Sequence, residues 1–408
     1  MSEWSYHTLD EHIRLGNIEL GRGDIISKID IKKYPGPYPI YSSSAQGDGK
    51  FGEYGKFMFD EELISWSVDG GGNFFYRPKH QFSVTNVSGY LRIKTKELGY
   101  RFLYYSLALQ HRDISFDYTT KAHPSVIKKL YSVPSIPKPE QDRIAEILST
   151  LDETIAQTEV LIAKHQQIKA GLMHDLFIRG VTADGHLRPT REQAPDLYKE
   201  SPLGWIPKEW GLSRCDSEFV IDSGITLGPH RRPNKSPHPY LRVANVYRDR
   251  VVLDDVAQLE ATLEEVEVGK LKRYDLLVVE GHANRNEIGR CAMVFNDAEG
   301  MLFQNHLFRL RAVRLDPSYS LLWLNSPRTQ HYWDSMCSTS SGLNTINRRL
   351  LGAMPILIPL QVEQRLIADA VFSCREEETT NAAYLAKLRQ QKHGLMHDLL
   401  TGKVRVLQ

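Results

Sequence analysis

Apolar residues recur at steps of three and four along two long stretches of this chain, a spacing that places them on one face of a helix. The first stripe consists of Ile144, Leu148, Leu151, Ile155, Ile162, Leu172 and Leu176, and the second of Ile367, Val371, Cys374, Leu385, Leu388, Leu395 and Leu399. Polar residues interrupt the stripes at Thr158, His165, Lys169, Glu378, Asn381 and Lys392. Polar positions in a helix pair fix its register at a cost in stability. We therefore predict two long helices with limited affinity for each other.

The two stretches are copies of one element. Ile136-Pro137 with Glu140-Gln141 opens the first, and Ile358-Pro359 with Glu363-Gln364 opens the second. The sequence Gly-Leu-Met-His-Asp-Leu closes both, at 171–176 and at 394–399, and its offset of 223 residues equals that of the Glu-Gln pair. Prolines before each helix and Gly180 and Gly402 after it mark the ends. Glu140 to Asp175 would span about 54 Å of helix.

A different globular segment precedes each copy. Both segments contain short alternating strands and glycine-rich turns, with strands predicted at 38–44, 63–68, 240–246, 275–279 and 306–311. Short helices are predicted near 102–110 and 318–324, and the polar stretch 182–202 is predicted to be a linker. The expected fold class is α+β, with two mixed, strand-rich domains, two long helices and approximate two-fold symmetry. The boundaries are 1–135 for the first domain, 136–180 for its helix, 181–204 for the linker, 205–357 for the second domain, and 358–408 for the second helix and tail.

Composition narrows the class of protein. The 408 residues are 41% hydrophobic and 25% charged, as in soluble globular proteins of two or three cores. No leader-like start and no stretch of about 20 apolar residues is present, so we expect a cytoplasmic protein. The four cysteines form no C-x-x-C pair, which argues against a zinc site. The net charge of +1 neither requires nor excludes a nucleic-acid partner, because a local basic surface can be hidden in a neutral total.

Several loops combine side chains that suit phosphates and base edges. Arginine offers paired donors to guanine, and asparagine or glutamine pairs with adenine. Arg231, Arg232 and Lys235 form a candidate phosphate clamp. The other candidates for DNA contact are Ser43, Ser44, Gln46, Asn73, Lys121, His123, Ser125, Asn284, Arg285, Asn286, Arg290, Ser340, Asn344, Asn347 and Arg348. Taken singly, each such loop is more often a solvated loop than a reading loop.

Motifs for catalysis are missing from the sequence. It contains no phosphate-binding glycine loop, no zinc-protease motif and no Asn-Pro-Pro-aromatic sequence of base methylation. His174-Asp175 and its copy His397-Asp398 are more simply explained by the helix dipole and a docking surface than by acid–base chemistry. We expect no catalytic residue and no metal site.

Together these residues resemble the specificity subunits of type I restriction-modification systems. The resemblance covers essentially the whole chain: the paired starts and ends of the helices, and Ser201-Pro202-Leu203-Gly204-Trp205-Ile206-Pro207-Lys208-Glu209-Trp210, which is similar to the entry into the family's second target-recognition domain. Trp4 is the counterpart at the start of the first. Departures are the extra residue in Leu360-Gln361-Val362 and the polar Glu378, which break strict helix symmetry.

The resemblance implies a non-catalytic reader of double-stranded DNA, in which each target-recognition domain binds half of a bipartite site and two antiparallel helices fix the spacer. Modification subunits, which carry S-adenosylmethionine, would dock on the helices, and restriction subunits, which use ATP with Mg, would join them. The expected partner surface is 140–178 and 363–401, represented by Glu140, Gln141, His174, Asp175, Glu363, Gln364, His397 and Asp398. The alternative is a coiled-coil scaffold whose two globular domains bind protein partners.

Overall fold

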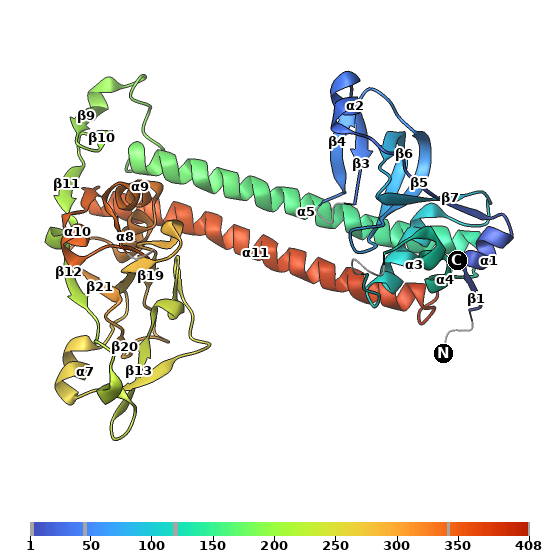
Figure 1. Ribbon diagram of the computed structural model, residues 1–408. Coiled ribbons are helices and arrows are strands. Elements are labelled where there is room, and N and C mark those ends of the chain that lie inside the picture. Colours follow the sequence, from blue (N-terminus) through green and yellow to red (C-terminus); the bar gives the residue numbers. More distant parts are fainter. Residues whose placement is uncertain (1–3, 44–46, 117–120, 341–342, 407–408) are drawn as a thin grey trace. The chain divides into compact units, whose positions relative to one another are not determined.

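The structure of the chain is a computed structural model that describes residues 4–43, 47–116, 121–340 and 343–406. Side chains of 338–343 are outside the description. The chain forms two compact units, unit 1 with residues 1–162 and 380–408 and unit 2 with residues 163–379. Two long helices, α5 (Lys138–Ile178) and α11 (Gln361–Leu400), contribute to both (Figure 1). The α+β class and the two long helices are thereby confirmed.

Unit 1 is built on one six-stranded sheet with strand order β2-β7-β5-β6-β3-β4. Adjacent strands of this sheet are antiparallel, except that β3 and β6 are parallel, with Ile40 opposite Ser83. The elements are β1 (Tyr6–Thr8), α1 (Leu9–Arg14), β2 (Ile18–Arg22), α2 (Lys28–Lys33), β3 (Tyr38–Tyr41), β4 (Lys50–Tyr54), β5 (Phe59–Ser67), β6 (Phe74–Val84), β7 (Ser88–Ile93), α3 (Tyr100–His111), α4 (Pro124–Leu130) and β8 (Ser132–Pro134).

Unit 2 divides its strands among smaller sheets, of which β12-β21-β17-β19, β16-β13-β20 and β18-β23-β22 have three or four strands. From the linker to the middle of the unit the elements are η1 (Pro195–Leu197), β9 (Tyr198–Ser201), β10 (Gly204–Pro207), β11 (Gly211–Arg214), α6 (Cys215–Glu218), β12 (Phe219–Ser223), η2 (Pro229–Arg231), β13 (Pro237–Leu241), η3 (Val243–Asn245), β14 (Val246–Tyr247), β15 (Arg250–Val251), β16 (Ala257–Glu260) and α7 (Leu263–Gly269).

The second half of unit 2 contributes its central strands and the helices beside them. These elements are β17 (Leu276–Val279), β18 (Gly281–His282), η4 (Arg285–Glu287), β19 (Cys291–Met293), β20 (Leu302–Phe303), β21 (Leu307–Ala312), α8 (Pro317–Leu324), α9 (Pro327–Met336), β22 (Ser338–Ser340), β23 (Leu343–Thr345), α10 (Arg348–Ala353) and β24 (Pro355–Ile358). The predicted short helices near 102–110 and 318–324 are confirmed as α3 and α8.

The predicted strand at 240–246 is wrong for residues 242–245, which separate β13 from β14. The backbone turns into η3 because the buried Asn245 side chain satisfies backbone groups that a strand would have paired. Its Oδ1 accepts from the Arg242 amide at 2.9 Å, and its Nδ2 donates to the Val252 carbonyl at 3.0 Å. The stretch predicted as a linker also contains structure, since β9 pairs antiparallel with β10 and the Tyr198 hydroxyl donates to the Pro189 carbonyl at 2.5 Å.

The apolar stripes of both helices are confirmed, because none of their residues is exposed. In unit 1, Ile144 and Leu148 of α5 and Leu399 of α11 enter the core with α3. In unit 2, Leu176 of α5 and Ile367 and Val371 of α11 enter the core with α8. Each helix therefore contributes apolar surface to both cores, which is where most of the stability of a long helix comes from.

Polar residues of the stripe pair across the two helices. In unit 1 the Lys392 Nζ lies 2.5 Å from Asp152 and the Arg389 Nη2 lies 2.7 Å from Glu159, which makes α5 and α11 antiparallel there. In unit 2 the ammonium of Lys169 pairs with Glu378. Lys169 and Lys392 occupy the same place in the repeated element, so each copy of this lysine meets a carboxylate.

Candidate nucleic-acid interface

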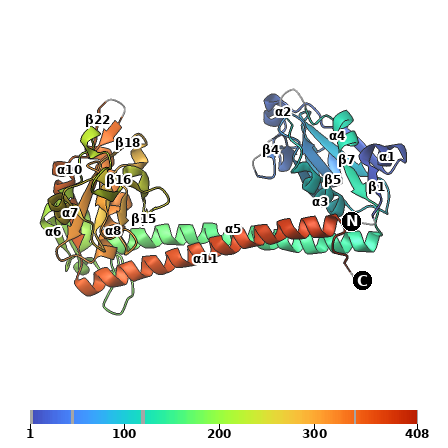
Figure 2. The same cartoon turned by 90° about the horizontal axis from the view of Figure 1, so that it is seen from below.

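Two of the predicted reading loops of unit 2 meet in one small sheet. Strand β23 pairs with β18, with Asn344 opposite His282, and also with β22. The Ile346 amide donates to the Glu280 carbonyl at 2.8 Å, which fixes the second loop beside the first. Figure 2 shows β18 and β22 together at one end of unit 2. Residues 282–287 and 344–348 thus form one surface although they are distant in sequence.

Exposed amide and guanidinium groups lie on this surface. Asn284 caps η4 by accepting from the Asn286 amide at 3.1 Å, and Asn286 holds the loop through its carbonyl, which accepts from Arg248 at 2.7 Å. Arg285 is half-exposed, and its Nε lies 3.4 Å from the Asp334 carboxylate. Asn347 and Arg348 are exposed at the start of α10, where Asn347 accepts from the Leu350 amide at 2.9 Å. Asn284 and Asn347 thus hold the loop backbone with their side-chain oxygens and Arg285 pairs with Asp334, while all three side chains keep exposed surface.

Three predicted contact residues of unit 2 are buried or engaged within the unit. Arg290 is only 7% exposed. It donates to the Val243 carbonyl at 2.9 Å and lies 3.2 Å from Glu287, so it connects the loop to η3. Asn344 is 8% exposed within its strand. Arg231 makes a two-pronged pair with Glu265, in which Nη1 lies 2.8 Å from Oε2. Single-sequence patterns show residue type but not which of these side chains turns inward.

The other cations of the predicted phosphate clamp remain on the surface. Arg232 and Lys235 are exposed beside η2. Glu260 holds this loop, because its carboxylate accepts from the backbone amides of Asn234, Lys235 and Ser236 at 2.8–3.1 Å. Those hydrogen bonds lower the pKa of Glu260. Arg232 and Lys235 therefore stay candidates for phosphate contact.

In unit 1 the candidate loops also converge. The Ala122 amide donates to the Val68 carbonyl at 3.1 Å, and the Lys121 Nζ lies 2.9 Å from Asp69. The Ser67 hydroxyl donates to the Ser43 carbonyl at 3.3 Å, and the Ser43 hydroxyl donates to the Val87 carbonyl. Three segments of unit 1 are thus neighbours: Ser43, the turn at 67–73 and the loop at 121–125.

The remaining candidates of unit 1 differ in exposure. Asn73 is half-buried, and its carbonyl accepts from the Ser67 amide at 3.1 Å. His123 and Ser125 are exposed, and His123 caps α4 by accepting from the Ser125 amide at 3.3 Å. Ser44 and Gln46 lie outside the described residues, as does the side chain of Ser340.

The repeated Glu-Gln pair was predicted to face a partner subunit, and the structure places it in the interior. Glu140, Gln141, Glu363 and Gln364 are 2–6% exposed. The Gln141 Oε1 accepts from the Gly99 amide at 2.9 Å, and the Gln364 Oε1 accepts from the Asp316 amide at 2.8 Å. Each glutamine also donates to a carbonyl just before its own helix, Ile136 or Pro359, at 2.9 Å. These glutamines connect the start of each helix to its globular domain by hydrogen bonds.

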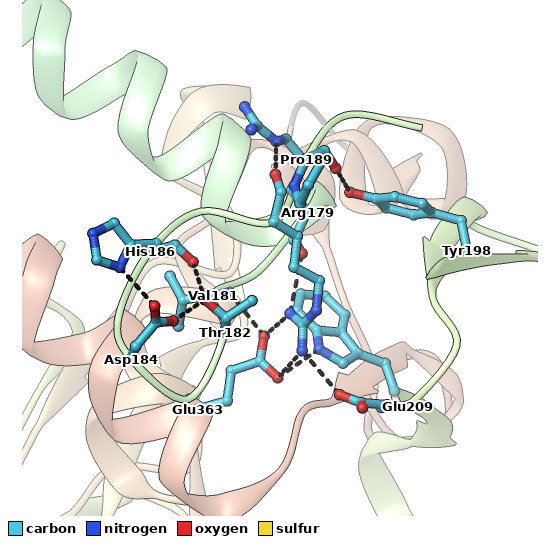
Figure 3. Close-up of polar contacts among 11 residues, drawn as sticks. Arg179, Val181, Thr182, Asp184, His186, Pro189, Tyr198, Glu209 and Glu363 are labelled. Carbon is cyan, nitrogen blue, oxygen red and sulfur yellow. Dashed lines mark hydrogen bonds and ion pairs between the residues drawn. The ribbon is translucent and has the colours of Figure 1, made fainter. Parts of the chain in front are cut away.

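Each repeated glutamate holds an arginine that follows the opposite helix. Glu363 at the start of α11 accepts from Arg188 (Nη2 to Oε2, 3.0 Å), from the Trp210 indole at 3.0 Å and from the Val181 amide at 2.9 Å (Figure 3). Glu140 at the start of α5 makes two contacts of 2.7 Å with Arg405, which lies 5.5 Å from the Trp4 ring centroid. The repeated Gly-Leu-Met-His-Asp-Leu sequence keeps His174 and His397 exposed, whereas Asp175 and Asp398 pair with Arg179 and Lys403.

Sequence reasoning missed Arg188, Arg405 and Trp210 as functional parts of these anchors. A weak signal was an arginine a short distance beyond each helix-ending glycine, since Arg188 follows Gly180 by eight residues and Arg405 follows Gly402 by three. Within the described residues, no cluster of three or more His, Cys, Asp or Glu side chains is placed to hold a metal ion. The same part of the chain contains no helix that is long and apolar enough to cross a membrane.

The two anchored helices and the two strand-rich units can be compared with proteins of known class. Residues 1–167 match the family described as "Type I restriction modification DNA specificity domain". Over nearly its whole length the chain is similar to a curated type I specificity subunit, and its fold is similar to that of a solved S subunit.

Among particular relatives, the type I restriction enzyme MjaVIII specificity subunit of Methanocaldococcus jannaschii is 25% identical over 94% of this chain and 92% of its own length. A Mycoplasma pneumoniae protein named for the N-terminus of a type I specificity subunit is 38% identical over 22% of this chain, and the match spans half of that protein. The solved S subunit of a type I restriction-modification system from M. genitalium shares the fold with a TM-score of 0.59, at 19% identity, over 98% of this chain and 96% of that one.

Proposed function

We propose that this chain is the DNA-sequence-recognition subunit of a type I restriction-modification complex and that it has no catalytic role of its own. Unit 1 and unit 2 each carry a target-recognition domain, and each domain reads one half of a bipartite site. The helices α5 and α11 set the unread spacer between the half-sites. The observation that carries the proposal is the repetition of one anchored helix behind two globular domains whose loops differ.

The proposed reading surface of unit 2 consists of Asn284, Arg285, Asn286, Asn347 and Arg348. These side chains are exposed, and their backbones are held by caps and by β18-β23 pairing. A preorganised loop loses little entropy when it binds, so its donors can discriminate between bases. Lys121, His123 and Ser125 occupy the equivalent place in unit 1, because His123 and Asn347 each cap the helix that follows the loop.

Modification subunits, with bound S-adenosylmethionine, dock on the outer faces of the helices, where His174 and His397 are exposed. Restriction subunits with ATP and Mg complete the complex. The docking surface excludes Glu140, Gln141, Glu363 and Gln364, because these side chains are engaged inside the units. A variant in which His174 and His397 are both changed to Ala should copurify less modification subunit and keep its own unfolding temperature.

Domain exchange tests the proposed division of labour. Replacement of residues 1–135 by the corresponding domain of another type I specificity subunit should change one half of the methylated site and leave the other half and the spacer length unchanged. A change in both halves would contradict the assignment of one half-site to each unit. The reciprocal exchange of residues 205–357 is the matched control, and it should alter only the other half.

A further inference from the structure

Unit 1 carries a basic surface on α2, apart from the candidate loops described above. Lys28, Lys32 and Lys33 are exposed on α2, and the Lys56 Nζ lies over the Tyr34 ring at 3.6 Å from its centroid. None of these four lysines has an ion-pair partner among the described residues. The one carboxylate on the helix, Asp30, caps it by accepting from the Ser27 amide at 3.0 Å. We call Lys28, Lys32, Lys33 and Lys56 the α2 basic surface.

Apolar side chains stand out from the same element. Ile25 is 79% exposed and Ile29 is 76% exposed. Phe51 on the neighbouring strand β4 is 51% exposed. Figure 1 shows α2 beside the end of β3 and β4. Exposed isoleucines between unpaired lysines are expected where a surface is covered by a partner that offers both negative charge and apolar area.

The backbone register makes α2 the counterpart of the predicted phosphate clamp of unit 2. Asp24, before α2, forms an isolated parallel bridge with Thr85, and Ile225, before η2, forms the same bridge with Gln304. The next strands, β3 and β13, then pair parallel with β6 and β20. The segments 25–33 and 226–235 therefore occupy the same position in the two domains.

In each unit, one turn contacts both the residues just before the basic segment, 25–33 or 226–235, and the candidate reading loops. In unit 1 the turn between β6 and β7 contacts both sides, since the Asn86 carbonyl accepts from Arg22 and the Val87 carbonyl accepts from Ser43. In unit 2 the Asn305 amide donates to Ile225 at 3.0 Å, and His306 lies 2.7 Å from Glu280, beside the loop at 281–287. The basic segment and the reading loops are thus neighbours across the same turn in both units.

We propose that the α2 basic surface binds the phosphates of duplex DNA next to the half-site read by unit 1, with Ile25 and Ile29 against the sugar edges. This inference rests on the proposed function. Lysine contacts to phosphates add affinity without sequence information, and each contributes about 0.9 to the slope of log affinity against log salt concentration. Apolar contacts to the sugars add affinity that does not depend on salt in this way.

The test compares DNA binding by the full chain, copurified with its partner subunits, over a series of salt concentrations. The variant with Lys28, Lys32 and Lys33 changed to Gln should bind specific and unrelated duplexes more weakly by similar factors, with a slope smaller by about 2–3. The control changes Lys96, Lys199 and Lys208, three exposed lysines outside this surface, to Gln and should keep the parent slope. Ile29→Ser should weaken binding with the slope unchanged, and Leu15→Ser, at another exposed apolar residue, should not.

The outcomes separate this inference from the proposed function. If the parent complex recognises its duplex and the triple lysine variant keeps the full slope, the α2 basic surface does not bind phosphates. If Ile29→Ser removes partner subunits from the complex instead of weakening DNA binding, the surface is a protein contact and the inference fails. If the parent itself shows no preference for any duplex, the proposed function fails first, and the inference fails with it.

Discussion

Glu363 at the start of α11 holds Arg188, which lies beyond the end of α5, with 3.0 Å between Arg188 Nη2 and Glu363 Oε2. Both side chains are less than 10% exposed, and Trp210 and Val181 donate to the same carboxylate (Figure 3). Removal of one partner from a buried ion pair leaves the other charged and desolvated, which costs about 3–5 kcal/mol.

Glu363→Gln should therefore lower the free energy of unfolding of unit 2 by about 3–5 kcal/mol. Urea unfolding of the full chain measures this effect. The control Glu377→Gln alters an exposed carboxylate on the same helix and should change the stability by less than about 1 kcal/mol. Equal effects of the two substitutions would show that the buried pair is not an anchor. Glu140→Gln should have an intermediate effect, because its partner Arg405 is half-exposed.

Gly180 is the second element of this anchor. Its φ of +63° is in the left-handed region, and a Cβ there would lie 2.1 Å from the Glu363 Oε1. Gly180→Ala should destabilise the chain by more than about 1 kcal/mol, because it adds backbone strain to a collision with the ion pair. Gly171→Ala, in the interior of α5 with open space at its Cβ, is the matched control and should stabilise the chain by about 0.5–1 kcal/mol. Thermal unfolding of both variants gives the comparison, and stabilisation by both would contradict the close packing at Gly180.

A pH dependence is expected from the Arg231–Glu265 pair. The Arg231 guanidinium and the Thr262 amide lower the pKa of Glu265 from its ordinary value of 4.5 to about 2. Because the folded-state pKa is the lower one, the unfolded chain binds the extra proton, and the contribution is complete above pH 4.5 and is lost as pH falls toward 2. Unfolding free energies measured across this range should fall less steeply for Glu265→Gln than for the parent. Identical slopes would show that the pair does not persist in solution.

Arg285 is the sharpest test of base reading. Arg285→Ala should cost about 1–3 kcal/mol of binding to the specific duplex and relax the preference at one base position. The control Arg273→Ala changes an exposed arginine stacked over Tyr274 and should leave both quantities unchanged. Binding measured with a set of duplexes that carry single base changes reads out both effects. A loss that is uniform over all duplexes would assign Arg285 to a phosphate, and an unchanged affinity would remove it from the interface.

Asn344 is better tested by an unfolding measurement than by DNA binding alone. It is 8% exposed in β23, so Asn344→Ala is expected to reduce stability before it affects DNA binding. An unfolding measurement distinguishes the two effects. A loss of DNA affinity without a loss of stability would place its side chain at the interface after all.

The sequence predicted the elements well where the signal was local. The stripes of α5 and α11 follow from the three- and four-residue spacing, and Gly180 and Gly402 follow from the chemistry of helix ends. The burial of Glu140 and Glu363 was not predictable in this way. A charged residue at a helix start is usually solvated, and the arginines that compensate for burial lie 265 and 175 residues away.

The DNA-contact residues illustrate the same limit. Arg285 and Arg290 are equivalent in a residue pattern, yet one is half-exposed and the other is buried against the Tyr247 ring at 5.6 Å. The α2 basic surface does not stand out in the sequence because Ile29, Asp30 and Ile31 separate Lys28 from Lys32 and Lys33, and Lys56 lies near them only in the fold. The relation between these two segments depends on a shared register with β6 and β20, which only the fold reveals.

Sequence recognition by this chain within a methylating complex can be tested with a genome-wide map of methylated adenines in the source cell with and without the chain. We predict that the cells without the chain lose methylation at one bipartite motif, in which two short specified blocks flank a gap of fixed length. An unchanged map, in cells where the modification subunits are expressed, would contradict it.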